Sequence, residues 1–487
     1  MTAAPAGPGA PSTKPAPRNA LDRFFSVTER GSTFGAEIRG GLVTFVTMAY
    51  IVILNPIILS SAPDVEGTTL AFPAVGAATA LAAGVMTIAF GLVTRLPFGF
   101  AAGLGINAYL AFSVVGQVTW PEAMALVVVN GLVIVLLAAT GLRKMIFDAV
   151  PLQLKLAITV GIGLFIAFIG FVNAGFVTTT GEASPPVGLG VGGSVATAPT
   201  LLFVITLVLT GILVALKVKG GLLIGLVTGT VLSVIAEAVW QLGAAADGNA
   251  GGWSLTVPTL SGSPFALPDL SLVGAIDFGF DLGRVSMVAL VMIVFTLVFS
   301  NFFDAMGTMT GLAKEADLAD EKGDFPRIKS ALIVEGVGAV VGGATSSSSN
   351  TVFIESGAGI GEGARTGLAN VVTGVMFLLA MFLTPLTSIV PTEIAAAALV
   401  IVGAMMMAQI AHIDLTDFGV LLPVFLTVTV MPLTFSIANG IGAGFISWVL
   451  IQTFSRRART VSPLLWIVAA GFVIYFARGP IQALVGA

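Results

Sequence analysis

Apolar runs of roughly 20 residues recur along almost the whole chain, and most of them are separated only by short polar stretches. A helix of about 20 apolar residues spans the roughly 30 Å hydrocarbon core of a bilayer, so each run can form one crossing. Only 9% of the residues are charged, against about 25% in a typical soluble domain. We therefore predict an all-α polytopic membrane protein that is surrounded by the lipid bilayer.

The apolar runs predict fourteen spans, in two groups of seven. The first seven lie at about 40–60, 72–93, 98–116, 121–141, 153–173, 198–216 and 221–242. The second seven lie at about 285–312, 328–343, 345–362, 366–390, 394–411, 417–435 and 437–454. The predicted organisation is a disordered tail at 1–35, a first repeat at 36–242, an external loop at 243–284, a second repeat at 285–455, and a basic turn with an extra C-terminal hydrophobic segment at 456–487. That last segment crosses the membrane, re-enters it or lies on it.

The positions of lysine and arginine predict the orientation, because short cytoplasmic loops collect these residues. With the N-terminus inside, 19 of the 21 Lys and Arg residues, Lys155 among them, fall on the cytoplasmic side. The long loops at 174–197 and 243–284 carry none until Arg284, at the edge of a span. We predict a multi-pass protein of the bacterial inner (plasma) membrane with a cytoplasmic N-terminus.

Two groups of seven spans that share a fold must be inverted repeats, because an odd-numbered unit followed by itself enters the membrane from the opposite side. The third span of each group is interrupted: 95–107 carries Pro97 and three glycines, and 342–351 carries four consecutive serines. We expect short extended segments here, in spans 3 and 10, that pair with each other and lead into half-helices whose N-termini point at the midplane. Close helix packing by small residues is the other interpretation.

Acidic residues inside the spans are the predicted functional groups, because burying a charge in lipid is costly. On a helix, Asp304 shares one face with Asn301 and Thr308, which gives a polar stripe in an apolar span. Glu355 follows the second interrupted run, where a half-helix N-terminus favours negative charge. Structural roles are the alternative for both residues. Glu335 lacks such a stripe and is predicted to support the site.

The interrupted third and tenth spans, with acids at these positions, resemble the azaguanine-like purine permeases of the nucleobase–cation symporter 2 superfamily. The motifs that carry the resemblance are Asn55-Pro56, Gly103-Leu104-Gly105-Ile106-Asn107-Ala108-Tyr109, Asn301-Phe302-Phe303-Asp304-Ala305-Met306-Gly307-Thr308 and the run from Glu355 to Leu368. The resemblance implies a seven-plus-seven inverted repeat, in which spans 1–4 and 8–11 form a core domain and spans 5–7 and 12–14 a gate domain. It also implies proton-coupled uptake of hypoxanthine, guanine or adenine by alternating access.

The resemblance matches Asp304 and Glu355 to the two site acids of the family and Asn107 to its third-span polar residue. Two features depart from the family's pattern: Glu335 stands where an aspartate is expected, and Ser346–Ser349 is unusually rich in serine. Substrate preference therefore stays open.

A purine base carries N–H donors, nitrogen acceptors and a flat face, which suits a carboxylate, backbone N–H groups and an aromatic ring. We predict that Glu355 binds the base and that Phe302 and Phe353 stack on it. Gly105 and Ser356, beside the predicted half-helices, complete the substrate-binding set together with Asn107. Because a dry setting disfavours a charged carboxylate, we predict that Asp304 takes up the coupling proton.

Other classes of protein are less consistent with the sequence. An anion transporter or channel of the same architecture should have a basic residue near the midplane, and we place none of the 21 Lys and Arg there. Zero cysteines and one histidine, His412, leave no set of ligands for zinc or haem. We therefore expect neither a metal site nor another cofactor, apart from the coupling proton, and no enzyme activity. No nucleic-acid partner is expected, and a homodimer stays open.

Overall fold

The computed structural model describes residues 19–141, 149–182, 184–249, 251–260, 263–320 and 325–477. Within these residues, ten helices are long and apolar enough to cross a membrane. They correspond to ten of the fourteen predicted spans, whereas the third, ninth, tenth and thirteenth predicted spans form shorter elements. The chain is therefore a multi-pass helical membrane protein, and helix length alone supports ten of the fourteen predicted crossings.

Elements from both halves of the chain pack together as one bundle, which we call the core domain. From the first half it contains α2 (Phe34–Met48), α3 (Ile51–Ser60), α4 (Phe72–Thr94), β1 (Phe100–Ala102), α5 (Leu104–Tyr109), the π-helical turn η1 (Leu110–Val114) and α6 (Trp120–Thr140). From the second half it contains α11 (Met287–Glu315), α12 (Ile328–Ala344), β4 (Asn350–Val352), α13 (Ser356–Gly361), α14 (Gly367–Ala380) and α15 (Thr384–Thr387).

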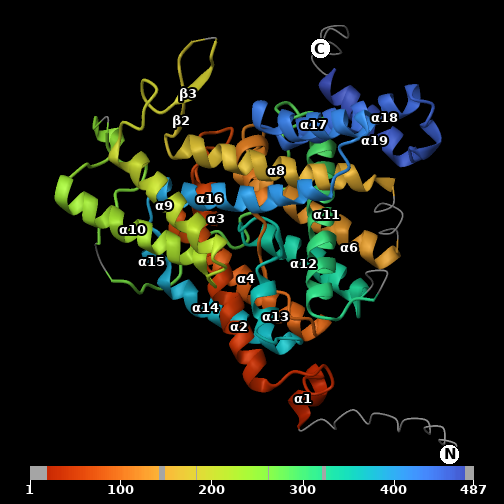
Figure 1. The fold of residues 1–487 in the computed structure, drawn as a ribbon, viewed down its shortest axis with the longest axis horizontal. Coiled ribbons are helices and arrows are strands. Elements are labelled where there is room, and N and C mark those ends of the chain that lie inside the picture. The colour runs from red at the N-terminus through yellow and green to blue at the C-terminus, as the bar shows by residue number, and fades with distance from the viewer. Residues whose placement is uncertain are drawn as a thin grey trace, which may run out of the picture.

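A second group of helices, the gate domain, also mixes the two halves. It contains α8 (Leu152–Asn173), α9 (Ala198–Ala215), α10 (Gly221–Trp240), α16 (Thr392–Met407), α17 (Phe418–Leu433) and α18 (Ile437–Phe454). Figure 1 shows α8 and α16 side by side across the molecule, with α2, α4, α12, α13 and α14 below them in that view. A small hairpin of β2 (Val177–Thr179) and β3 (Val187–Leu189) follows α8.

The helix packing is symmetric under exchange of the two halves, as an inverted repeat requires. Helix α6 packs on α12 just as its counterpart α14 packs on α4, and α9 packs on α10 as α17 packs on α18. Glycines allow the first two contacts: a Cβ on Gly131 would clash with the carbonyl of Gly336, and a Cβ on Gly367 would clash with that of Gly91. Small residues let helix backbones approach closely in lipid. The predicted inverted-repeat fold with core and gate domains is therefore confirmed.

Both ends of the described chain are helical. Within the predicted tail 1–35, residues 1–18 lie outside the described residues, but α1 (Ala20–Phe25) is helical and Phe25 is buried. The ordered chain thus begins earlier than predicted, because Asn19 caps this helix and the buried Asp22 accepts a hydrogen bond from the Thr28 hydroxyl. At the C-terminal end, α19 (Pro463–Phe476) packs against α11 and α18. Its 14 residues span only about 21 Å, less than the hydrocarbon core.

Candidate functional site

The two interrupted spans meet at the centre of the core domain. Strands β1 and β4 pair antiparallel, with Phe100 opposite Val352 and Ala102 opposite Asn350. Backbone hydrogen bonds extend this pairing at both ends, from Gly103 N–H to the Ser349 carbonyl (2.9 Å) and from Phe353 N–H to the Gly99 carbonyl (3.0 Å). The two strands occupy equivalent places in the two repeats and run in opposite directions. The backbone N–H and C=O groups that each interrupted helix leaves unpaired are therefore hydrogen-bonded to those of the other strand. The predicted short extended segments are therefore confirmed.

The extended segments are shorter than both interrupted runs. In the run 95–107, extended chain is wrong for the last four residues, because α5 already begins at Leu104. Predicted extended chain at 342–351 is wrong over most of that range, since α12 continues to Ala344 and a turn follows it. In this turn Ser346 and Ser348 adopt left-handed φ angles of 57° and 69°. The amide of Ser347 is bonded back to the Gly342 carbonyl (2.9 Å). The serines therefore close the end of α12, and only Asn350–Val352 is strand.

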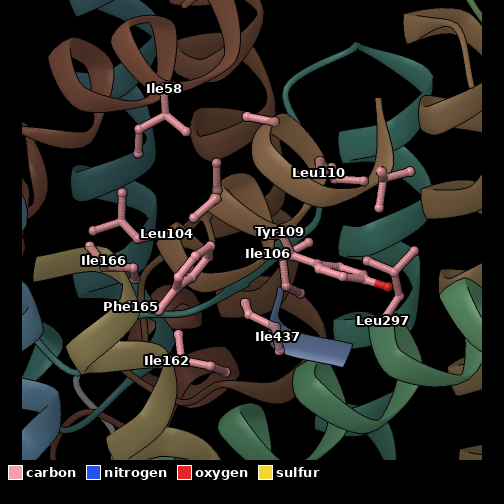
Figure 2. Close-up of a cluster of buried hydrophobic side chains, with 14 of the residues drawn as sticks. Ile58, Leu104, Ile106, Tyr109, Leu110, Ile162, Phe165, Ile166, Leu297 and Ile437 are labelled. Carbon is pink, nitrogen blue, oxygen red and sulfur yellow. The ribbon is translucent and has the colours of Figure 1, made fainter. Parts of the chain in front are cut away.

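Each strand leads into a half-helix, α5 after β1 and α13 after β4. The α5 helix begins at Leu104 after Gly103, and within the described residues no side chain caps its first N–H groups. Its apolar residues pack against the gate: Figure 2 shows Leu104, Ile106 and Tyr109, with Leu110 of η1, in one cluster with Ile162, Phe165 and Ile166 of α8. The core and gate are thus tightly packed beside the later turns of α8.

Asp304 lies in the middle of α11, at the interface between the core and gate domains. It lines a cavity of about 170 Å³ with Phe303 and Thr308 from the same helix and with Lys155 and Thr159 from α8. Asp304 also lines a smaller neighbouring cavity, which includes Gly103 and Gly105 at the start of α5. The structure therefore brings Asp304, Thr308 and Gly105 together beside the uncapped end of a half-helix.

Glu355 precedes α13 and lines a different cavity between core and gate. Its Oε1 accepts a hydrogen bond from the Tyr50 hydroxyl of the core at 2.5 Å. Thr47, Lys217 and Lys219 line the same cavity. Asp304 and Glu355 are close enough to interact electrostatically, but among the described cavities no single one contains both.

Several other predicted site residues lie in the protein interior instead of a described cavity. Ser356 accepts from Gly99 N–H (2.9 Å) and donates to the Phe353 carbonyl (2.7 Å), so its hydroxyl joins α13 to β1. Asn301 donates to Ser349 Oγ at 3.0 Å. Asn107 is fully buried, and its amide makes no hydrogen bond within the described residues.

The aromatic residues and Glu335 are also buried. Phe302 and Phe353 are 2% and 7% exposed and line none of the cavities described above, whereas Phe303 lines both Asp304 cavities. Glu335 is fully buried on α12 beside Thr351 and Val352 of β4, which places it behind the strand pair.

Tyr50, Phe303 and Lys155 are among the cavity residues that sequence reasoning missed. Tyr50 lies in the first predicted span, 305 positions from Glu355 in the chain. Its hydroxyl group within an apolar run was the one signal in the sequence that could have identified it. Phe303 was passed over for its neighbour Phe302. Lys155 was counted with the cytoplasmic cations, yet it is only 9% exposed and lines the main Asp304 cavity.

Two interrupted spans that cross as strands, with acidic side chains in cavities between two helical domains, define an inverted-repeat solute transporter. The fold is similar to the transmembrane domain of the cyanobacterial bicarbonate transporter BicA, with a TM-score of 0.55 and 16% identity over 86% of this chain and 97% of that one. It is also similar to the murine anion transporter Slc26a9 in its inward-facing state, with a TM-score of 0.56 and 11% identity over 87% and 69%. These likenesses concern the fold alone.

The sequence matches the permease family over residues 35–443. The chain belongs to this family, the nucleobase–cation symporter 2 permeases, which confirms the resemblance seen in its motifs. The guanine/hypoxanthine permease PbuG of Bacillus subtilis is 37% identical over 94% of this chain and 99% of its own length. The adenine permease AdeP of Escherichia coli is 34% identical over 95% and 97%.

Proposed function

We propose that this chain takes up purine nucleobases (hypoxanthine, guanine or adenine) together with protons, by alternating access. The observation that carries the proposal is full-length similarity to PbuG and AdeP, a guanine/hypoxanthine permease and an adenine permease. The cavities between core and gate add chemistry suited to a purine, since they contain carboxylates, a tyrosine hydroxyl, a phenylalanine ring and free backbone N–H groups.

In the proposed cycle, the Glu355 carboxylate accepts hydrogen bonds from N–H groups of the base, and Tyr50 holds the carboxylate in position. Asp304 takes up the proton. Movement of the gate helices α8 and α16 against the core then exposes the site alternately to the two sides. A carboxylate is an acceptor when ionised and also a donor when protonated, so the state of Asp304 changes what the site can bind.

We propose that this structure is inward-facing, with the N-terminus in the cytoplasm as the charge pattern predicts. The Asp304 cavity lies along the first three turns of α8, from Leu152 to Ile162. The later turns of α8, with Phe165 and Ile166, are packed into the apolar cluster of Figure 2. We place the chain in the bacterial inner membrane as a transporter without enzyme activity or cofactor, and a homodimer remains compatible with it.

Uptake of radiolabelled hypoxanthine in a bacterial strain that lacks its own purine transporters tests this function. Cells that produce the chain should accumulate label, a protonophore should abolish accumulation, and unlabelled hypoxanthine, guanine or adenine should compete better than xanthine or uracil. Bicarbonate serves as an anion control, because transporters of both anions and nucleobases could use this fold. Accumulation equal to that of empty-vector cells would reject the proposal.

Tyr50→Phe should weaken purine binding without abolishing transport. A hydrogen bond to a charged group contributes about 1.5–3 kcal/mol, so we expect the dissociation constant to rise by roughly tenfold to a hundredfold. Binding of labelled hypoxanthine to purified protein measures this. The matched control is Tyr475→Phe on α19, outside the site cavities described above. Equal affinities of the two variants would show that Tyr50 does not position Glu355.

A further inference from the structure

Lys155 is a gate-domain cation that lines the same cavity as the core acid Asp304. It lies in the second turn of α8 and is 9% exposed. Its ammonium nitrogen is 5.2 Å from the centroid of the Phe303 ring, on the residue next to Asp304 in the chain. Among the described residues, Asp304 and Lys155 are the two charged side chains that line this cavity.

Among the described residues, the two other charged groups known to interact electrostatically with Asp304 are acidic. Glu355 before α13 and Glu335 on α12 both interact electrostatically with it. Neither lines the cavities of Asp304 as described. A deprotonated Asp304 therefore experiences repulsion from its own domain, and the cation facing it comes from the gate.

The shared cavity of Lys155 and Asp304 affects one step of the transport cycle, the return of the empty carrier. An isolated charge is costly to enclose in a low-dielectric interface, whereas an opposite charge at short range offsets part of that cost. The loaded carrier moves with Asp304 protonated and needs no such compensation. The empty carrier must move with Asp304 deprotonated if protons are to be coupled to substrate.

We infer that Lys155 is the countercharge of deprotonated Asp304 and thereby permits the empty carrier to return. This inference rests on the proposed proton-coupled uptake. Lys155 acts through Asp304 and does not contact the purine, so it is a positioning residue for the coupling group. Its loss slows net uptake, which needs the empty carrier to return, and spares exchange of internal for external purine, which does not.

Proteoliposomes that contain the full chain separate the two activities. Net uptake is measured as labelled hypoxanthine entry driven by an inward proton gradient, and exchange as label entry into vesicles preloaded with unlabelled hypoxanthine. Lys155→Gln should lower net uptake by roughly tenfold or more, since deprotonated Asp304 would then lack the opposite charge that lines its cavity, and exchange should match wild type. Lys155→Arg should restore net uptake, and Lys314→Gln, at the exposed end of α11, serves as the control.

A double variant provides the second readout. In the Asp304→Asn variant there is no negative charge for Lys155 to compensate. The double variant Asp304→Asn, Lys155→Gln should therefore exchange purine at the same rate as Asp304→Asn alone. Equal loss of uptake and exchange in Lys155→Gln, or no loss of either, would overturn the inference. If Lys155→Gln is absent from the membrane fraction, Lys155→Met is subjected to the same two measurements. Wild-type vesicles that neither take up nor exchange purine would instead reject the proposed function itself.

Discussion

Asp304→Asn should abolish concentrative purine uptake while leaving exchange of purine intact. Asparagine has nearly the shape of aspartic acid and can still donate and accept hydrogen bonds, but it cannot take up or release a proton at neutral pH. Asp304 lines two cavities between α8 and α11, one of which reaches the start of α5, so a change of its charge acts where the core meets the gate. We therefore expect transport that continues down a purine gradient and no longer responds to protons.

The measurement is labelled hypoxanthine accumulation in proteoliposomes after a pH step, with counterflow measured in the same preparation. Asp317→Asn is a suitable control, because its side chain is 89% exposed just beyond the end of α11. Asparagine also tolerates the positive φ of 56° found at that position. Accumulation by Asp304→Asn at the wild-type level after the pH step would remove Asp304 from the coupling role.

Glu355→Gln should lose most purine binding, which is a different defect from that of Asp304→Asn. The glutamine amide keeps one acceptor but loses the negative charge, and charge-assisted hydrogen bonds are about twice as strong as neutral ones. The Tyr50 hydroxyl would also lose its charged acceptor. We expect the dissociation constant for hypoxanthine to rise by roughly a hundredfold or more, with uptake and exchange falling together.

Equilibrium binding of labelled hypoxanthine to the purified variant tests this expectation. Glu182→Gln, in an exposed position of the loop after α8, makes the same chemical change outside the site and should bind normally. Unchanged affinity in Glu355→Gln would exclude Glu355 from the site. The expected results distinguish the two acids. Asp304→Asn binds and exchanges purine without proton coupling, whereas Glu355→Gln does not bind purine.

Much of the fold follows from local properties of the chain. The interrupted runs after Arg95 and after Gly342 were recognisable, because proline, glycine and serine cannot sustain a regular helix at those densities. The predicted extended chain at the second site was too long, because the hydrogen bonds of Ser346 and Ser347 to the end of α12 depend on how the turn closes. Asp304 and Glu355 were recognisable as acids inside apolar segments, where a charge is costly.

The membrane class, the two repeats and the interrupted spans can be predicted from the sequence, since they depend on segment length, apolar content and the local preferences of the backbone. Which side chains share a cavity depends on how the helices pack. The choice of Phe303 over Phe302, the bond from Tyr50 to Glu355 and the position of Lys155 opposite Asp304 all depend on how helices rotate and pack against distant segments. These helices carry apolar residues on nearly every face. Their helical periodicity is therefore too weak to indicate which face meets the gate.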